Sequence, residues 1–315
     1  MRTPTGHARL LPWLSLLVVY VVWGSTYMAI RVVVRHLPPF ATASLRFLIA
    51  GSMMAGVAFL VDRSAGWPAP RQILDYSAIG VMLLSVGNGL VMWSERTIPS
   101  GIAALIVATV PLWLTFFDGL RPGGQAWTGR VWAGTAAGLV GVLLVARPQG
   151  GVASGHWVGV LALQVASLSW TAGSLYSQSV RRRVPLVTAA AIEMLAGGLV
   201  LFLLSRLRHE DLEAFLAAPP RAWLGILYLV VFGSLVGFTA FAYCLNELPA
   251  STVGTYAYVN PVVAVALGSL FLGEPLSPGL VAGGLLILTA VLLSTTGRRP
   301  RPAAPSRSPA TAAEG

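Results

Sequence analysis

The sequence predicts an all-α membrane protein whose ten transmembrane helices form two inverted five-helix repeats. Hydrophobic residues make up 56% of the 315 residues and charged residues only 10%, whereas a soluble domain is usually about 25% charged. Apolar runs long enough to cross a bilayer recur along the whole chain. Matched residues also recur in the same order in the two halves of the chain.

The first apolar run, residues 11–34, is long enough to span a bilayer and lacks the small-residue cleavage site of a signal peptide. Nine more runs follow, and arginines, prolines and very short connections separate them. At roughly 20 residues each, ten spans use about two thirds of the chain and leave little for a soluble domain. The ten helices are expected at 11–34, 40–61, 74–94, 99–118, 127–146, 156–179, 185–205, 222–245, 250–272 and 278–296.

Residues 11–146 therefore form the expected first repeat and residues 156–296 the second. Residues 1–10 precede them, and the tail 297–315, rich in Pro, Ala, Ser and Arg, is expected to be disordered. With the N-terminus in the cytoplasm, 13 arginines fall on cytoplasmic segments and 7 on outer segments. This bias predicts that both termini are cytoplasmic.

The sequence lacks the residues that several other classes of protein need for their function. The net charge of +10 comes from arginines scattered between apolar runs, which argues against a nucleic-acid partner. The chain has no lysine, so it lacks a phosphate-binding loop for ATP. A single cysteine excludes an internal disulfide, and four scattered histidines offer no metal-ligand spacing, so we expect no metal and no cofactor.

The internal repeat carries the functional prediction. Trp23 matches Trp170 at an offset of 147 residues, and Gly87 matches Gly237 at an offset of 150. Each repeat has an odd number of spans, so the second repeat enters the membrane from the opposite side. Inverted repeats of this kind are typical of secondary transporters, which bind substrate near the middle of the membrane between the halves. An inert scaffold or a channel built by duplication is the alternative.

Several short motifs give the chain a resemblance to a known family. In the first half these are Trp23-Gly24-Ser25-Thr26-Tyr27, Leu45-Arg46-Phe47, Val86-Gly87-Asn88-Gly89, Pro99-Ser100-Gly101-Ile102-Ala103-Ala104 and Ala108-Thr109-Val110-Pro111. In the second half they are Ser169-Trp170, Ala191-Ile192-Glu193-Met194-Leu195-Ala196, Tyr256-Ala257-Tyr258-Val259-Asn260-Pro261 and Gly273-Glu274. This ordered set resembles the EamA family of the drug/metabolite transporter superfamily, and within it a branch of bacterial inner-membrane exporters.

The resemblance implies a ten-helix bundle in which helices 1–4 and 6–9 surround a central cavity, while helices 5 and 10 are peripheral. It also implies a bacterial inner-membrane location and substrates such as amino acids, other metabolites or toxic compounds. Many members carry a Gly-Glu pair after helix 4 as well as after helix 9. Here Glu274 follows helix 9 but its repeat mate is Gln125, so a symmetric acidic pair is absent.

Two charged residues are expected inside the membrane. Arg46 lies seven residues into helix 2, where a charge is costly unless it faces a cavity or a partner. Its planar guanidinium is suited to a substrate carboxylate or phosphate, and a structural role is the alternative. Glu193 lies at a similar depth in helix 7. It is the candidate proton carrier of an antiporter, and a static Arg46–Glu193 salt bridge is the alternative.

Aromatic and amide side chains complete the expected cavity. Trp23, Tyr27, Trp170 and Tyr176 stand beside small hydroxyl residues such as Ser25, a combination suited to amphipathic substrates, with packing as the alternative. The remaining candidates for substrate contact are Asn88, Tyr256 and Asn260. Pro111 and Pro261 are expected to act as gating elements because a proline interrupts helix hydrogen bonding.

Residues at the expected helix ends are read differently. Glu95, Glu247 and Glu274 are expected to be solvated boundary charges. The Gly134-xxx-Gly138 and Gly279-xxx-Gly283 spacings are expected to bring helices close together, and they leave a monomer or a homodimer possible.

The hypothesis is a secondary active transporter that exports small organic metabolites, amino acids or related amphipathic compounds, by proton antiport with alternating access. Its partners are the substrate, the lipid bilayer and protons. An uncoupled facilitator of the same fold is the first alternative. An intramembrane lipid-modifying enzyme and a receptor or assembly subunit are the others.

Overall fold

A computed structural model describes residues 6–61, 68–120, 128–147, 156–180, 184–248 and 250–296. The expectations for residues 1–5 and for the tail 297–315 lie outside these ranges. Within them the chain contains seven helical segments long and apolar enough to span a membrane. Three shorter apolar helices, Gly129–Val145, Tyr256–Leu272 and Pro278–Ser294, bring the described spans to ten. The predicted fold class is confirmed.

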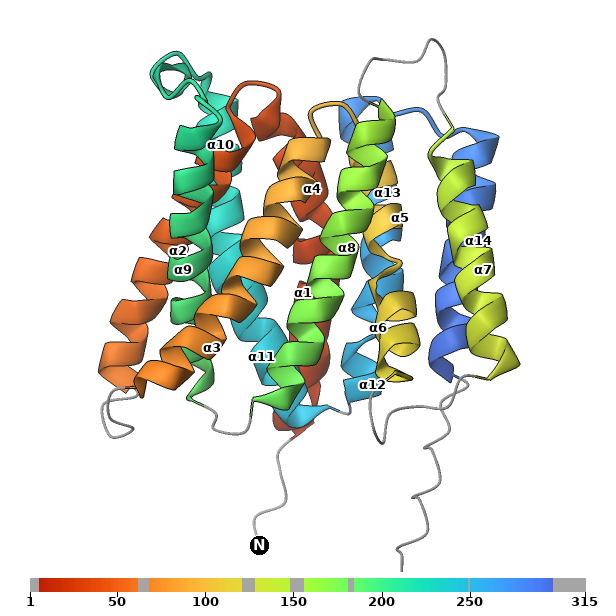
Figure 1. Cartoon of the computed structure of the whole chain (residues 1–315), viewed down its shortest axis with the longest axis horizontal. Helices are drawn as coiled ribbons and strands as arrows, with labels where there is room; N and C mark the ends of the chain where they lie inside the picture. Colours follow the sequence, from red (N-terminus) through yellow and green to blue (C-terminus); the bar gives the residue numbers. More distant parts are fainter. Residues whose placement is uncertain are drawn as a thin grey trace, which may run out of the picture.

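The first half supplies five spans (Figure 1). The first two are α1 (Gly6–Val34) and α2 (Pro39–Val61). The third is continuous but changes its winding, from α3 (Pro70–Gly80) through the π-helical η2 (Val81–Asn88) to α4 (Gly89–Ser94). The fourth consists of α5 (Ser100–Val107) and α6 (Val110–Asp118), and the fifth is α7 (Gly129–Val145).

The second half repeats this plan with matching irregularities. It begins with α8 (His156–Ser179) and α9 (Leu186–Leu207), followed by a short 3-10 turn, η3 (Glu213–Phe215). The next span again contains a π-helical segment, with α10 (Pro220–Tyr228), η4 (Leu229–Val236) and α11 (Gly237–Glu247). The last elements are α12 (Ala250–Val253), α13 (Tyr256–Leu272) and α14 (Pro278–Thr296).

The two halves run in opposite directions. In Figure 1, α1 starts at the end of the bundle nearest the marked N-terminus, and α8, its counterpart, starts at the other end. We call the end at which α1 begins the proximal end and the end at which α1 finishes the distal end. The opposite directions of α1 and α8 are those of an inverted repeat.

Reciprocal contacts hold the two halves together at the matched tryptophans and glycines. A Cβ atom on Gly87 would lie 2.3 Å from the Nε1 atom of Trp170, and a Cβ atom on Gly237 would lie 2.4 Å from the Nε1 atom of Trp23. Each tryptophan therefore packs against the glycine of the other half, directly beside the π-helical segment. Only glycine leaves room for an indole ring at these two positions.

The peripheral helices α7 and α14 pack closely against each other. A Cβ atom on Gly141 would lie 2.9 Å from the carbonyl oxygen of Gly283, and a Cβ atom on Gly134 would lie 2.9 Å from that of Ala290. These glycines let the two backbones approach, as small residues do in membrane helix pairs. The glycine stripe on α7 therefore serves packing within one chain.

Two of the ten expected helices are interrupted. The expected helix 99–118 breaks after Val107, because Pro111 has no amide hydrogen to donate to the Val107 carbonyl. The expected helix 250–272 breaks at residues 254–255, where Gly254 favours a turn over a helix.

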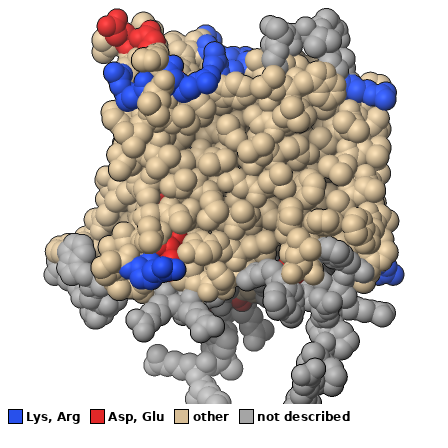
Figure 2. Space-filling model, in the orientation of Figure 1, with Lys and Arg blue, Asp and Glu red and all other residues tan. Residues whose placement is uncertain are grey.

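Figure 2 shows a broad uncharged band between two edges that carry the charged side chains. Large apolar side chains are exposed along the sides of the bundle, among them Phe59, Leu161 and Leu285. An uncharged apolar girdle between charged rims is the surface that a bilayer requires, since hydrocarbon offers no partner for charges.

Candidate functional site

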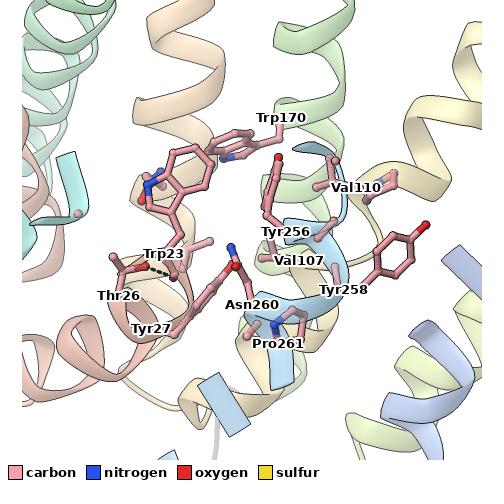
Figure 3. A pocket seen from close by; sticks show the side chains of 18 of the residues that line it. Trp23, Thr26, Tyr27, Val107, Val110, Trp170, Tyr256, Tyr258, Asn260 and Pro261 are labelled. Carbon is pink, nitrogen blue, oxygen red and sulfur yellow. Dashed lines mark hydrogen bonds between the residues drawn. The ribbon is translucent and has the colours of Figure 1, made fainter. Parts of the chain in front are cut away.

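A cavity of about 510 Å³ lies between the two halves. Its wall is built by α1, α2, η2, α4, α5 and α6 from the first half, and by α8, η4, α11 and α13 from the second (Figure 3). The peripheral pair contributes only Leu292 of α14. The seventh span was expected to border the cavity, but none of the side chains that line the cavity comes from it. That helix, α9, contributes none because it packs along α2.

Aromatic rings dominate the part of the wall that Figure 3 labels. The ring of Trp23 lies 5.3 Å from that of Tyr256, 5.0 Å from Phe241 and 5.9 Å from Phe238, measured between centroids. Trp170 of α8 lines the same cavity, and Tyr27 lies one turn along α1 from Trp23. These rings provide a large apolar surface with hydroxyl and indole N–H groups at its edges, which suits an amphipathic molecule.

Arg46 places a cation in this wall. Its side chain is 5% exposed, and its Nε atom donates to the Ser234 hydroxyl at 3.0 Å. The guanidinium carbon lies 4.8 Å from the ring centre of Phe47, and a Cβ atom on Gly233 would lie 3.1 Å from the Nη2 atom. The Nη1 atom has no hydrogen-bond partner. A buried guanidinium that is held from one side and keeps an unpartnered nitrogen has a geometry suited to an anion.

Four further expected residues also line the cavity, namely Asn88, Asn260, Pro111 and Pro261. With its amide nitrogen turned towards the backbone, Asn260 donates to the carbonyls of Tyr20 and Tyr256 at 3.2 Å each. The amide therefore ties α13 to α1 beside the wall of the cavity.

Three of the expected site residues lie away from the cavity. The Ser25 hydroxyl contacts the Tyr228 hydroxyl at 2.6 Å. The Tyr176 hydroxyl donates to Asp75 at 2.7 Å, and Asp75 pairs with Arg71 at 3.3 Å. Ser25 and Tyr176 therefore make contacts between helices and do not line the cavity.

Glu193 is the third expected residue outside the cavity wall. It lies half-buried on α9, where its backbone packs against α3, since a Cβ atom on Gly80 would lie 2.2 Å from the Glu193 carbonyl oxygen. Arg46 and Glu193, both within the described residues, form no ion pair with each other.

Two glutamates differ from the sequence expectation. Glu95 is fully buried, and Glu274 is half-buried with its carboxylate bound to the N-terminus of α5, so neither is a solvated boundary charge. Only Glu247 is exposed, as expected. Their sequence positions at helix ends do not reveal this, because the burial comes from other helices that meet there.

The EamA-like transporter family matches residues 11–147 and 157–296, which are the two repeats. The inner membrane transporter YedA of Escherichia coli (strain K12) is 40% identical over 297 residues, covering 94% of each chain.

Two more distant relatives have named substrates. A probable terminal-alkyne amino-acid exporter of Streptantibioticus cattleyicolor is 27% identical over 93% of this chain and 97% of its own. A probable amino-acid metabolite efflux pump of Salmonella typhimurium is 25% identical over 92% of this chain and 96% of its own.

The family consists of transporters and not enzymes, and the relative from Escherichia coli lies in the inner membrane. A small-molecule substrate and the lipid bilayer are therefore the partners of such a chain. With both repeats matched, a cavity between them and ten membrane spans, the chain belongs to the EamA-like transporter family as a multi-pass inner-membrane transporter.

Proposed function

We propose that this transporter exports amino acids or related amphipathic compounds by proton antiport, with alternating access of the cavity to the two sides of the membrane. Both termini lie in the cytoplasm in this proposal, which follows the arginine bias of the sequence. The observation that carries the proposal is the cavity itself, whose wall is shared by the two inverted halves.

The chemistry of the wall supports a substrate with an anionic group and an apolar body. The unpartnered Nη1 atom of Arg46 is suited to a carboxylate, and the rings of Trp23, Trp170 and Tyr256 suit an amphipathic side chain. The printed names of the two distant relatives point to amino acids as well. Asn88 and Asn260 add polar contacts, with Asn260 as the link between α1 and α13.

The proline positions support alternating access. Pro111 stands just after the break between α5 and α6, and Pro261 lies inside α13; both line the cavity. We propose that these two helices bend at the prolines when the cavity changes sides, since freed backbone groups make such points the least costly places to bend.

Everted membrane vesicles containing the protein test this proposal with a panel of radiolabelled amino acids and amphipathic cations. Accumulation that collapses when a protonophore is added is the expected result. Equilibration that ignores the protonophore would show the alternative, an uncoupled facilitator. A folded protein that moves no member of the panel would refute the proposed substrate class.

A further inference from the structure

Four elements of both halves meet at the distal end of the bundle and bring three charged side chains together. Arg31 comes from the last turn of α1, Glu95 follows α4, and Glu274 follows α13 and approaches the first residue of α5, Ser100. The Arg31 guanidinium donates to the backbone carbonyl of Glu95. We call Arg31, Glu95, Ser100 and Glu274 the distal cluster.

The carboxylate of Glu274 is fully occupied. It accepts hydrogen bonds from the backbone nitrogens of Ser100 and Gly101 at 2.7 and 3.1 Å and from the Ser100 hydroxyl at 3.0 Å. These contacts cap the N-terminus of α5, where the helix dipole favours a negative charge. Glu274 is therefore a structural carboxylate that holds the start of α5.

The carboxyl group of Glu95 has the opposite surroundings. The residue is 0% exposed, and neither of its carboxyl oxygens has a hydrogen-bond partner. The Nε atom of Arg31 is also buried without a partner. An ionised carboxylate in such a place loses its solvation and gains no hydrogen bond in return, so the protonated form is the stable one while this end is closed.

The distal cluster lies one helical turn beyond the cavity wall. Tyr27, Val91 and Ala104 line the cavity, and each is four residues along its helix from a member of the cluster, namely Arg31, Glu95 and Ser100. Four residues correspond to about 6 Å of rise and to the same helix face. The distal cluster therefore lies directly next to the cavity along three helices.

The charged members of the cluster have no counterparts in the repeat. At the offsets of the surrounding matches, Arg31 corresponds to Gln178, Glu95 to Leu245 and Glu274 to Gln125. If these charges only held helices together, we would expect a similar cluster in the other repeat, at the opposite end of the bundle. Three charges placed at one end alone indicate a task specific to that end.

We propose that Glu95 is the proton-binding site of the transporter, protonated while the distal end is closed and exchanging its proton as the end opens. This inference rests on the proposed antiport. The step breaks the carboxyl O–H bond and transfers the proton to water. The carboxylate that remains is then balanced by the adjacent Arg31 guanidinium.

The surrounding charges agree with this assignment. Glu95 follows the last residue of its span, and burial raises the pKa of its carboxyl well above the ordinary range, while Arg31 lowers it and Glu274 raises it. Arg35, directly after α1, is exposed, and His156 on α8 is bound to the Ala146 carbonyl. Glu210 caps α2. Because the closed state binds the proton more tightly than water-exposed Glu95 would, its stability falls as pH rises.

The transport test compares wild type with Glu95→Gln in everted vesicles, using the panel member that wild type accumulates most. Glu193→Gln is the control, because it removes another membrane carboxyl group, which is half-buried and lies outside the distal cluster. We expect Glu95→Gln to lose protonophore-sensitive accumulation while still exchanging labelled for unlabelled substrate, and Glu193→Gln to keep both. Proton-driven accumulation by Glu95→Gln, or wild-type flux insensitive to the protonophore, would overturn the inference. Accumulation by Glu95→Gln overturns the inference alone, whereas protonophore-insensitive wild-type flux, or no wild-type flux at all, also contradicts the proposed antiport.

A second measurement needs no substrate. Dicyclohexylcarbodiimide reacts with protonated carboxyl groups in apolar surroundings, and mass spectrometry locates the modified residue in the purified full chain. We expect Glu95 to be modified at neutral pH and to lose reactivity at alkaline pH. An unmodified Glu95, or labelling that does not change with pH, would overturn the inference even if no substrate had been found.

Discussion

At the residue scale, the function rests on one cation held in an otherwise aromatic wall. Ser234 fixes the Nε atom of Arg46, Phe47 lies against its guanidinium, and Nη1 stays unpartnered. The fixed orientation reduces the entropy lost when a carboxylate binds, because the side chain is already ordered. The proposal therefore depends on the shape of the guanidinium as well as on its charge.

Replacing Arg46 by Lys keeps the charge but removes the planar fork and the bond to Ser234. A hydrogen bond to a charged group contributes about 1.5–3 kcal/mol, so the apparent affinity for an amino acid should fall about 10- to 100-fold. Concentration dependence of uptake measures this change. Arg71→Lys, at an exposed arginine outside the cavity, is the control. Unchanged affinity in Arg46→Lys would exclude direct carboxylate binding by Arg46.

At the element scale, the π-helical segments and their glycines position the two tryptophans. The Trp170 contact at Gly87 lies within η2, near its end, and the Trp23 contact at Gly237 directly follows η4. A π-helical turn changes the direction of the following residues relative to an α-helix, which is one reason such turns occur at functional sites. Each half of the chain therefore presents a glycine to the tryptophan ring of the other half.

A methyl group at Gly237 tests this contact. Gly237→Ala places a Cβ atom 2.4 Å from Trp23, so the indole must move, at a cost of about 1–3 kcal/mol for overpacking. The measurement is the thermal unfolding midpoint of the purified protein, together with transport. Gly56→Ala, in a helix where a Cβ atom meets nothing within 4 Å, is the matched control. Equal midpoints for both variants would show that the indole contact is not tight.

The break between α5 and α6 is the second element-scale feature with a consequence. Pro111→Ala restores the missing hydrogen bond to Val107 and stiffens the fourth span. We expect the maximal transport rate to fall more than the affinity for substrate. Pro70→Ala, at the exposed first turn of α3, is the control. If rate and affinity changed in equal proportion, Pro111 would not act as a gating element.

At the scale of the whole molecule, the sequence predicted the membrane fold and the ten spans. Trp23, Trp170, Gly87 and Gly237 were matched from their offsets alone, and in the structure they contact each other crosswise. Hydropathy and repeats are local or periodic signals, so a single sequence carries them.

The burial of Glu95 and the location of Glu193 depend on which helix faces meet. Glu95 directly follows its span and lies among the ends of α1, α5 and α13, whereas the backbone of Glu193 packs against α3. The spacing of residues along one helix predicts neither the burial of Glu95 nor the location of Glu193. The same holds for α9, which packs on α2 instead of lining the cavity.

The central claim is that this cavity exchanges a proton for an amino acid or a related compound. Purified protein in liposomes, with an imposed pH gradient and a radiolabelled amino acid chosen from the panel, tests it most directly. We expect accumulation against the concentration gradient that is driven by the pH gradient and lost in Arg46→Met. Uptake that only equilibrates, whatever the pH gradient, would contradict it.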